Sequence, residues 1–299
     1  LYENDPITDT EVINRFEDAD DELSVVLSRN DWEGTFPSMR TAAEKIISAA
    51  TNAGINSVDS LNPNTYTDFP IMGEEGEVTF QDLVDADYDN PMWEDLLDQI
   101  SSNDLIDLFN KGAFQTIAIL NIGKPKTTEA DGPAGFVNFM STGIVYGASH
   151  YACEPIMAAT FNKDLLFRLG EAVGDEGLIG NEAGDGIPYS GWYAPGVNLH
   201  RSPFGGRAGE YFSEDPFLTG VLAAYEIQGA MSKGVYTMVK HFAVNEQETS
   251  RSGVATWLDE QTLREIYLKP FEYTVKVGGT TGMMSSFNRI GAKWAGGDY

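Results

Sequence analysis

Residues 216–244 read PFLTGVLAAYEIQGAMSKGVYTMVKHFAV, and this stretch decides the fold class. Its first part, Pro216–Lys233, predicts a helix with a glycine at its end, and its second part, Tyr236–Val244, predicts a short apolar strand. A helix that leads directly into such a strand is typical of the crossover that joins parallel strands. The stretch therefore predicts an α/β fold with a parallel sheet.

The same alternation continues on both sides of this stretch. Strands are predicted at Thr116–Leu120, Pro155–Phe161, Trp192–Leu199 and Gly282–Phe287. Helices are predicted at Lys163–Gly174 and Asp259–Val277, and Pro270 is expected to kink the second. The chain holds about six such strand–helix units. They form a parallel sheet that is either open or closed into a barrel, and a complete (β/α)₈ barrel would need more chain.

The first third of the chain has a different character. Residues 1–110 hold 26 of the 46 acidic residues but only 4 of the 19 basic residues, which is typical of a solvated region. Helices are predicted at Ser38–Ala53 and Pro91–Leu108, with a break in the second near Ser101–Asn103. Between them, Asn56–Asn90 is rich in Asn, Asp, Gly and Pro and predicts loops.

The overall composition excludes several classes of protein. The 299 residues are 42% hydrophobic, which is enough for a large core, and their net charge of −27 would repel nucleic acid and anionic membranes. Cys153 is the single cysteine, so an intrachain disulfide and a cysteine-based zinc site are excluded. The compartment stays open between a bacterial cytoplasm and secretion.

A metal site is not expected from the sequence. The acidic cluster at residues 18–22 is dense enough for Ca²⁺, but it lacks the glycine and the spacing of an EF-hand loop. The three histidines, His150, His200 and His241, have no metal-ligand spacing. The phosphate-binding glycine motifs of nucleotide enzymes are also missing from the sequence. We therefore expect neither a metal nor a cofactor.

Polar side chains follow several of the predicted strands. In a parallel barrel the site lies at the carboxyl ends of the strands, so these residues are candidates for it. They are Lys124, Asp131, His200, Arg201, Arg207, Lys240, His241, Asn245, Glu246, Glu248, Arg251, Ser285, Ser286, Asn288 and Arg289.

Structural roles compete with functional ones for some of these candidates. Asp131 precedes Gly-Pro and could form a turn through its own side chain. Arg201 and Arg207 could pair with Glu210 or Glu214 nearby.

A further question concerns Lys240 and His241, which are adjacent in one predicted strand. Successive side chains of a strand point to opposite faces, so both reach one pocket only at the strand's end or at a bulge.

Four stretches resemble motifs of glycoside hydrolase family 3, in the same order along the chain. They are KPKTTEADGPAG at 124–135, APGVNLHRSPFGGRAGEYFSEDP at 194–216, KHFAVNEQETSR at 240–251 and MMSSFNRIG at 283–291. The KHFA form resembles the β-glucosidase branch rather than the N-acetylglucosaminidase branch, which carries KHFPGHG. The resemblance implies an incomplete (β/α)₈ TIM-like barrel with a sugar held in its mouth.

The resemblance also implies which residues bind the sugar. Asp131 would accept hydrogen bonds from sugar hydroxyls at the −1 subsite, and Met284 would pack nearby. The full set implied for this subsite is Asp131, Arg207, Lys240, His241, Arg251, Met284 and Phe287.

Two positions depart from the family pattern. Val137 stands where the family often has arginine, and Phe287 stands where tyrosine is usual. Each exchange removes a polar group from the region of the proposed sugar site.

The catalytic carboxylates of the family are expected outside this chain. The nucleophilic aspartate is expected after Tyr299, and the acid/base glutamate in a separate α/β sandwich domain. Residues 10–37 resemble the linker of family members in which the sandwich domain precedes the barrel. The expected division is thus an acidic linker at 1–37 and, at 38–299, most of a barrel that lacks its last strand–helix units.

The resulting functional hypothesis is an exo-acting, retaining β-glucosidase that hydrolyses terminal β-D-glucosyl residues of cello-oligosaccharides or aryl glucosides. Its expected partners are glucose, β-glucosides and a complementary polypeptide. The alternatives are a non-catalytic sugar-binding fragment, a related β-xylosidase, or a barrel aldolase with Lys240 as Schiff-base amine.

Overall fold

A computed structural model describes residues 70–137, 148–180, 188–291 and 293–297 of the chain. The predicted helix at 38–53, the acidic cluster at 18–22 and the proposed linker at 1–37 lie outside these residues. No helix in the described ranges is long and apolar enough to span a membrane.

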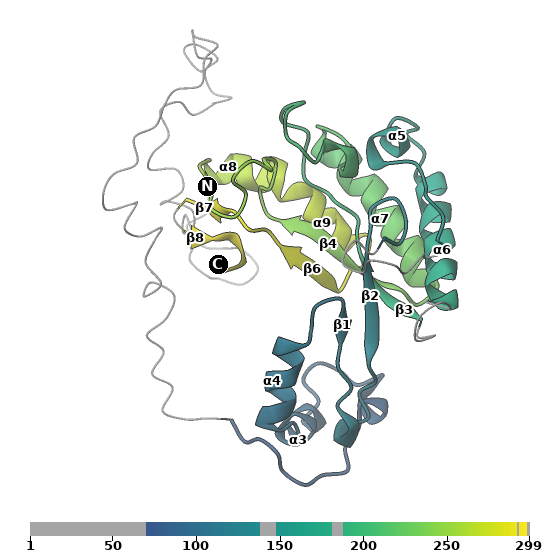
Figure 1. Ribbon diagram of the computed structural model, residues 1–299, viewed down its shortest axis with the longest axis vertical. Coiled ribbons are helices and arrows are strands. Elements are labelled where there is room, and N and C mark those ends of the chain that lie inside the picture. Colours follow the sequence, from purple (N-terminus) through teal and green to yellow (C-terminus); the bar gives the residue numbers. More distant parts are fainter. Residues whose placement is uncertain (1–69, 138–147, 181–187, 292, 298–299) are drawn as a thin grey trace.

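The core of the molecule is a curled sheet with the strand order β1-β2-β3-β4-β6 (Figure 1). Its strands are β1 at Gln115–Thr116, β2 at Thr127–Asp131, β3 at Tyr189–Tyr193, β4 at Tyr236–Phe242 and β6 at Gly282–Ser285. Strands β2, β3, β4 and β6 are parallel, while the short β1 pairs antiparallel with β2. The fold is therefore α/β, with the parallel sheet of an incomplete TIM-like barrel.

Helices pack on one face of this sheet. They are α6 at Lys163–Ile179, α7 at Pro216–Ser232 and α9 at Lys269–Lys276 (Figure 1). The short helix α5 at Glu154–Ala158 contacts α7, and α8 at Glu260–Thr262 contacts the turn that follows it. Helices α6 and α7 approach so closely that a Cβ on Gly170 would lie 2.0 Å from the Glu226 carbonyl oxygen, and one on Gly229 would lie 2.1 Å from that of Phe167. Glycine at both positions lets the two backbones touch.

The beginnings of α6 and α7 follow from local side-chain caps. The Asn162 side chain accepts a hydrogen bond from the Leu165 amide at 3.1 Å, and Asp215 accepts one from the Leu218 amide at 2.6 Å. Such caps satisfy amide groups that the first turn of a helix leaves without partners. Both helices were predicted from the sequence, and α6 continues to Ile179, five residues past the predicted end.

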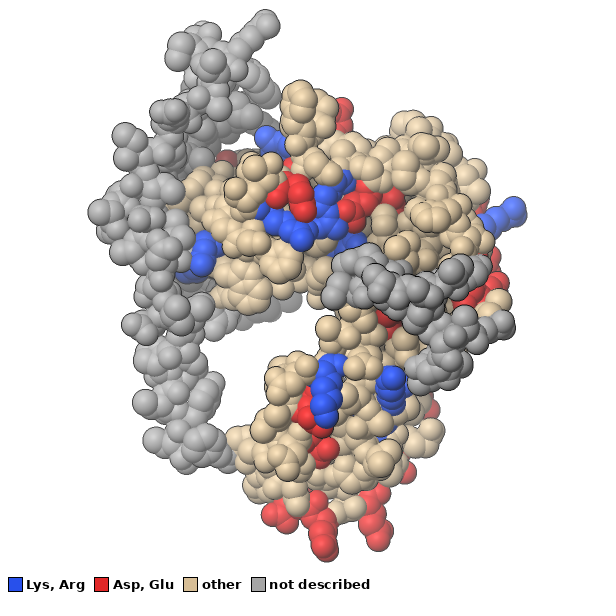
Figure 2. Space-filling model, viewed as in Figure 1, with Lys and Arg blue, Asp and Glu red and all other residues tan. Residues whose placement is uncertain are grey.

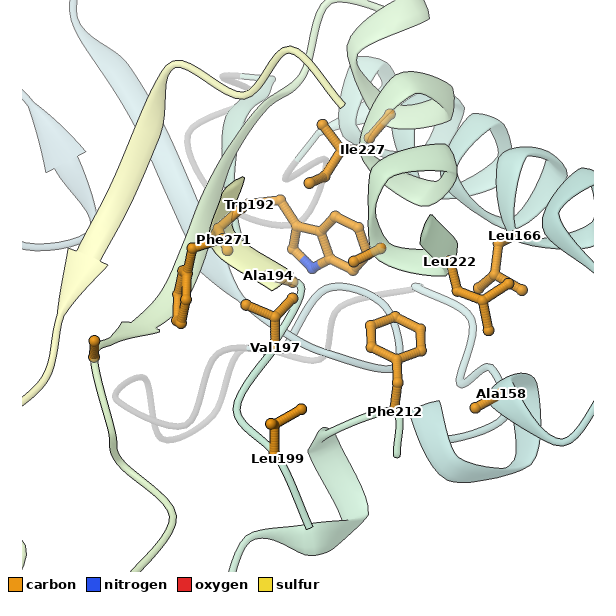
Figure 3. Packing of buried hydrophobic residues seen from close by; sticks show 14 of the residues in the cluster. Ala158, Leu166, Trp192, Ala194, Val197, Leu199, Phe212, Leu222, Ile227 and Phe271 are labelled. Atoms are coloured by element: carbon orange, nitrogen blue, oxygen red, sulfur yellow. The ribbon is translucent and has the colours of Figure 1, made fainter. Parts of the chain in front are cut away.

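Apolar side chains from the sheet and helices fill the space between them (Figure 3). Trp192 of β3 is fully buried, as are Leu166 of α6 and Ile227 of α7. Val197 and Phe212 close the same cluster from the segment that follows β3. Burying a large apolar side chain contributes about 1.5–3 kcal/mol, so this cluster fixes the position of the strand ends above it.

A smaller cluster lies below the main core. It is formed by a 3-10 helix at Phe80–Leu83, α3 at Met92–Asp98 and a 3-10 turn at Leu120–Ile122, and the chain continues from α3 into α4 at Ser102–Asn110. Ser101 caps α4 by accepting a hydrogen bond from the Asp104 amide at 3.2 Å, which confirms the predicted break between the two helices.

The carboxyl-terminal elements beside α8 are short. They are β5 at Ala255–Thr256, β7 at Arg289–Ile290 and β8 at Lys293–Trp294, which form a second small sheet. Leu263–Tyr267 is a π-helical turn between α8 and α9, and Pro270 lies in the first turn of α9. The kink predicted at Pro270 is therefore corrected: the helix is interrupted between Tyr267 and Lys269, and Pro270 lies just inside the new helix.

Three strand predictions are corrected. Pro155–Phe161 is not a strand, because Pro155 begins the short helix α5, where the ring fits a first turn. The run Thr116–Leu120 contributes only β1, and the first parallel strand is instead Thr127–Asp131. Strand β3 begins at Tyr189 and ends at Tyr193, so most of the predicted run Trp192–Leu199 lies beyond it. The main sheet of the described residues has four parallel strands, β2, β3, β4 and β6, whereas about six strand–helix units were predicted.

Candidate functional site

A buried ion pair joins the ends of strands β2 and β4. The Lys240 Nζ lies 2.6 Å from Asp131 Oδ1 and donates another hydrogen bond to the Gly132 carbonyl oxygen at 2.8 Å. Lys240 is 1% exposed, while the Asp131 side chain keeps 22% of its surface open to solvent. A charge-assisted contact of this kind is short and strong because little water competes for either group.

A second acid extends this pair into a chain of four charges. Glu210 Oε2 lies 3.6 Å from the Lys240 Nζ, and Glu210 Oε1 accepts a hydrogen bond from the Arg207 Nε. Glu210 belongs to a 3-10 turn at Ala208–Glu210 in the loop between β3 and α7. The pairing of Arg207 with Glu210 expected from sequence is present. Asp131 Oδ1 accepts a hydrogen bond from the adjacent Gly132 amide at 2.8 Å, but a side-chain turn at Asp131 would need the amide two residues on, and Pro133 has none.

These side chains line a cavity of about 380 Å³ at the carboxyl ends of the strands. Its lining consists of Asp131, Gly132, Pro133, Val137, Gly206, Arg207, Gly209, Glu210 and Lys240. Figure 2 shows basic side chains gathered among acidic ones on the upper part of one face, whereas the lower tip of the molecule is acidic. The cavity thus offers both hydrogen-bond donors and acceptors within a small space.

Two of the residues that line this cavity are glycines at positions that disfavour a side chain. A Cβ on Gly132 would lie 2.0 Å from the Trp192 Nε1, so only glycine lets the loop after β2 settle on the indole. Gly206 has a φ of +89°, a conformation that side chains disfavour, and it precedes Arg207 directly.

His241 is not among the residues that line the cavity and is 5% exposed. Its backbone amide donates to Asn198 Oδ1 at 2.8 Å, and its carbonyl oxygen accepts from Asn198 Nδ2 at 3.1 Å. Burial lowers the pKa of His241 to about 2, and the nearby charges of Arg207, Lys240 and Arg251 act in the same direction. The imidazole is therefore neutral throughout the ordinary pH range.

The strand containing Lys240 and His241 is irregular at this point. Its pairing with β6 shifts register between Lys240 and Phe242, and both Lys240 and His241 are buried. The bulge that would allow both side chains to serve one region is therefore present.

The remaining predicted residues lie beside the cavity rather than in its lining. Arg251 pairs with Glu248 at 3.1 Å, and its guanidinium lies 5.0 Å from the centre of the Phe287 ring. Phe287 is 56% exposed. Met284 of β6 is the register partner of Lys240, so it lies next to the ion pair in the sheet.

Two acids in this region are absent from the set implied for the sugar subsite, although Glu246 was among the candidates that follow the predicted strands. Glu210 completes the chain of charges, and Glu246 accepts hydrogen bonds from the Leu199 amide at 3.3 Å and from Asn198 Nδ2 at 3.4 Å. Burial raises the pKa of Glu246 to about 7. The available signal was their position inside charged motifs next to Arg207 and His241, which alone does not indicate burial.

A separate polar cluster lies deeper in the same sheet. Glu129 of β2 is 4% exposed and accepts hydrogen bonds from the hydroxyl groups of Tyr193 and Tyr236. Burial and the contact with Glu129 raise the pKa of both tyrosines. We name Glu129, Tyr193 and Tyr236 the floor cluster.

Metal ligands are not assembled in the described part of the chain. Within residues 70–137, 148–180, 188–291 and 293–297, no group of three His, Cys, Asp or Glu side chains could hold an ion. The His200 Nε2 instead lies 2.7 Å from the Tyr211 carbonyl oxygen, and Arg201 lies 5.3 Å over the Tyr267 ring. Both residues thus have structural contacts.

Comparison with known proteins identifies the family. Residues 134–297 match the model of the glycosyl hydrolase family 3 N terminal domain. The chain is 39% identical over 203 residues to a beta-glucosidase of Rhizobium radiobacter, covering 67% of this chain and 24% of that protein. It is 38% identical over 190 residues to beta-glucosidase A of Butyrivibrio fibrisolvens, covering 61% of this chain and 22% of that protein.

Solved structures give the same result. Beta-glucosidase 3B from Thermotoga neapolitana in complex with alpha-D-glucose is 36% identical, with a TM-score of 0.53 over 60% of this chain and 25% of that one. A beta-glucosidase from Paenibacillus barengoltzii is 32% identical, with a TM-score of 0.63 over 76% of this chain and 24% of that one. The chain spans about a quarter of the length of these relatives. By the match to its N-terminal domain, the chain belongs to glycosyl hydrolase family 3.

Proposed function

We propose that this chain forms the glycone-binding part of an exo-acting, retaining β-glucosidase, which removes terminal β-D-glucosyl residues from cello-oligosaccharides or aryl glucosides. The observation that carries the proposal is the chain of charges Asp131–Lys240–Glu210–Arg207 around one cavity. Relatives named beta-glucosidase, one of them solved in complex with alpha-D-glucose, support the choice of sugar.

The chemistry of the cavity suits a pyranose. Each sugar hydroxyl both donates and accepts, so it needs fixed partners of both kinds in a dry pocket. Asp131 would accept from hydroxyls, while Arg207 and Lys240 would donate to them. A volume of about 380 Å³ lies at the lower end of the usual range for ligand pockets, which is roughly 300–1,000 Å³, as expected for one sugar unit.

The contacts between these groups would hold them ready for the substrate. Glu210 contacts both cations, so neither has to be reoriented when a sugar enters. His241, Arg251, Met284 and Phe287 complete the proposed −1 subsite around this centre. Hydrogen bonds to the sugar 2-hydroxyl that strengthen in the transition state would supply several kcal/mol.

The two catalytic carboxylates belong, in this proposal, to segments outside this chain. A retaining glycosidase needs a nucleophile and an acid/base about 5–5.5 Å apart, and it works by double displacement through a covalent glycosyl-enzyme. We assign the nucleophilic aspartate to a strand following β6 and the acid/base glutamate to a sandwich domain. A complementary polypeptide that carries both is the expected partner, with residues 1–37 as linker and 38–299 as barrel.

The test uses a 2-deoxy-2-fluoro-β-glucoside, which accumulates the covalent intermediate of a retaining enzyme, followed by mass spectrometry under denaturing conditions. The expected result is an adduct on a peptide outside this chain, with much slower labelling in an Asp131→Ala variant. An adduct on a residue of this chain would overturn the assignment of the nucleophile. Sugar binding without any adduct would instead indicate a non-catalytic sugar-binding protein.

Sugar selectivity is tested by comparing two substrates. We expect kcat/KM for an aryl β-glucoside to exceed that for the matching β-xyloside, because the subsite is proposed to contact the whole glucosyl unit. The reverse ratio would favour the β-xylosidase alternative. The departures at Val137 and Phe287 make this comparison informative, since each lacks a polar group near the cavity.

A further inference from the structure

Tyr211 connects the loop before α7 to the ring of His241. The tyrosine is 3% exposed, and its hydroxyl oxygen lies 3.2 Å from His241 Nδ1 and 3.4 Å from the Asn245 carbonyl oxygen. The two rings are nearly perpendicular, at 78°, with centroids 6.2 Å apart. The His200 Nε2 lies 2.7 Å from the Tyr211 carbonyl oxygen and fixes the tyrosine backbone.

The Tyr211 hydroxyl has one proton and two possible acceptors. The shorter of the two distances is to His241 Nδ1. In the reverse arrangement Nδ1–H would donate to the phenol oxygen, but an unprotonated imidazole nitrogen is a far better acceptor than a phenol oxygen. A phenol is also a stronger acid than an imidazole N–H. Acid–base matching therefore places the hydroxyl proton toward Nδ1 rather than an Nδ1 proton toward the hydroxyl oxygen.

Both groups keep the protonation state that this contact requires. Burial raises the pKa of Tyr211, so the hydroxyl keeps its proton. Burial and the charges of Arg207, Lys240 and Arg251 keep His241 neutral. A neutral imidazole carries its proton on one nitrogen only. Because Nδ1 accepts the hydrogen bond from Tyr211, the ring proton lies on Nε2.

The backbone of His241 is held in place by hydrogen bonds to a neighbouring side chain. The Asn198 side chain accepts a hydrogen bond from the His241 amide and donates one to the His241 carbonyl oxygen. Asn198 also donates a hydrogen bond to the Glu246 carboxyl group. Among the residues that the structure describes, Tyr211 is the partner of the His241 ring, through Nδ1.

We propose that Tyr211 is a positioning residue that fixes His241 as the Nε2–H tautomer, so that this histidine offers a ligand a hydrogen-bond donor and never an acceptor. The identification of that ligand as a sugar rests on the proposed function. A sugar hydroxyl that accepts from Nε2–H must direct its own proton to another acceptor, and the Asp131 carboxylate is the nearby acid suited to receive it. The tautomer would thereby select the direction of the hydrogen bonds around the sugar.

The first test reads the tautomer directly in the protein labelled with ¹⁵N-histidine. Long-range ¹H–¹⁵N spectra distinguish a protonated from an unprotonated ring nitrogen, and the chain has only three histidines. His150→Gln and His200→Gln variants assign the signals. The expected result is a neutral His241 with its proton on Nε2 from pH 5 to pH 8. A proton on Nδ1, or a charged ring in this range, would overturn the proposal.

The second test removes only the hydroxyl, with Tyr211→Phe. We expect the Nδ1–H form of His241 to appear, and the Kd for glucose to rise about tenfold, which equals about 1.4 kcal/mol. Tyr225→Phe is the matched control, because its hydroxyl contacts the surface residue Lys163 at 3.0 Å and is remote from His241. An unchanged tautomer in Tyr211→Phe would overturn the proposal.

The two readouts separate this inference from the proposed function. If the wild-type spectrum shows the Nε2–H tautomer but glucose does not bind, the sugar assignment fails while the role of Tyr211 stands. If glucose binds but His241 carries its proton on Nδ1, the role of Tyr211 fails alone. The wild-type spectrum decides this even if the Tyr211→Phe variant does not fold.

Discussion

Strand β2 carries two acids on one face, Glu129 and Asp131, and the fold treats them differently. Asp131 lies at the end of the strand, where it meets the Lys240 ammonium at the wall of a cavity. Glu129 lies two residues earlier, where it meets the hydroxyl groups of Tyr193 and Tyr236 in the floor cluster. Because alternate residues of a strand share a face, the same pattern supplies one acid for each layer.

The comparison shows that the position of a carboxylate along a strand decides whether it can bind a ligand or serves as a structural contact. At the end of the strand, which we call the rim, Asp131 pairs with Lys240 but keeps part of its surface open to solvent, so it can bind a ligand as well. In the floor cluster, neutral phenols satisfy the carboxyl group without leaving space for a ligand. We therefore interpret Asp131 as a binding residue and Glu129 as a structural support beneath it.

The largest expected effect comes from removing the cation at the rim. Lys240→Met removes the cation of Asp131, while Glu210 keeps its pairing with Arg207, and breaking a buried pair costs about 3–5 kcal/mol. We expect kcat/KM for an aryl β-glucoside to fall by about three orders of magnitude or more in the assembled enzyme. Lys233→Met is the control, since that lysine pairs with Asp175 at 3.2 Å on the surface. Less than a tenfold loss in Lys240→Met would show that the rim pair does not bind substrate.

A smaller effect of a different kind is expected in the floor cluster. Glu129→Ala removes the carboxylate acceptor of two half-buried tyrosine hydroxyl groups, of which only that of Tyr236 keeps a second acceptor, Thr127 Oγ1, and a donor left unsatisfied costs about 1–3 kcal/mol. Denaturant unfolding of the folded protein measures this loss. We expect the Kd for glucose to change less than in an Asp131→Ala variant of the same protein. An equal loss of affinity in both variants would remove the distinction between the two acids.

A third acid, Glu226 of α7, differs from both, because in the described residues its carboxyl group has no hydrogen bond from a cation or from a tyrosine hydroxyl. It is 1% exposed, both of its carboxyl oxygens are buried without a hydrogen-bond partner, and burial raises its pKa to about 8. The folded chain then holds this proton more tightly than the unfolded chain. Stability should be full below the usual glutamate pKa and should decrease as the pH rises toward 8.

The measurement is the melting temperature between pH 5 and pH 8. Glu226→Gln should reduce the decrease over this range by roughly 5 °C, because glutamine has no proton to release. Glu272→Gln is the surface control. Lys269 and Lys276 lower the pKa of Glu272 to about 2, so its titration affects stability only in acid, below the measured range. A pH dependence unchanged by Glu226→Gln would mean that this carboxyl is satisfied in the folded protein.

The helices of this protein were the most predictable elements. Asn162 and Asp215 stand at the starts of α6 and α7, and each forms a cap with an amide three residues ahead. The short helix α5 was missed because its apolar run resembles a strand, although Pro155 carried a helix-start signal. Such signals are local, so they can be read without knowing the fold.

Strand β2 could not be predicted from its own residues. Its sequence TTEAD is polar, and the usual sign of a buried strand is an apolar run. Only the two distant tyrosines explain why Glu129 is buried there, and these lie 64 and 107 residues away in sequence. Of the candidate site, the sequence indicated Asp131, Arg207, Lys240 and the pairing of Arg207 with Glu210, but not the contact of Glu210 with Lys240 or that of Tyr211 with His241.

The sequence by itself determined the α/β class, the starts of α6 and α7 and the motifs that indicate the family, because these depend on neighbours a few residues apart. The tertiary structure alone decided which acid meets which partner. Asp131 and Lys240 are 109 residues apart, and the register of β2, β3 and β4 brings them to 2.6 Å. A difference of one residue in that register would turn a side chain to the other face of the sheet.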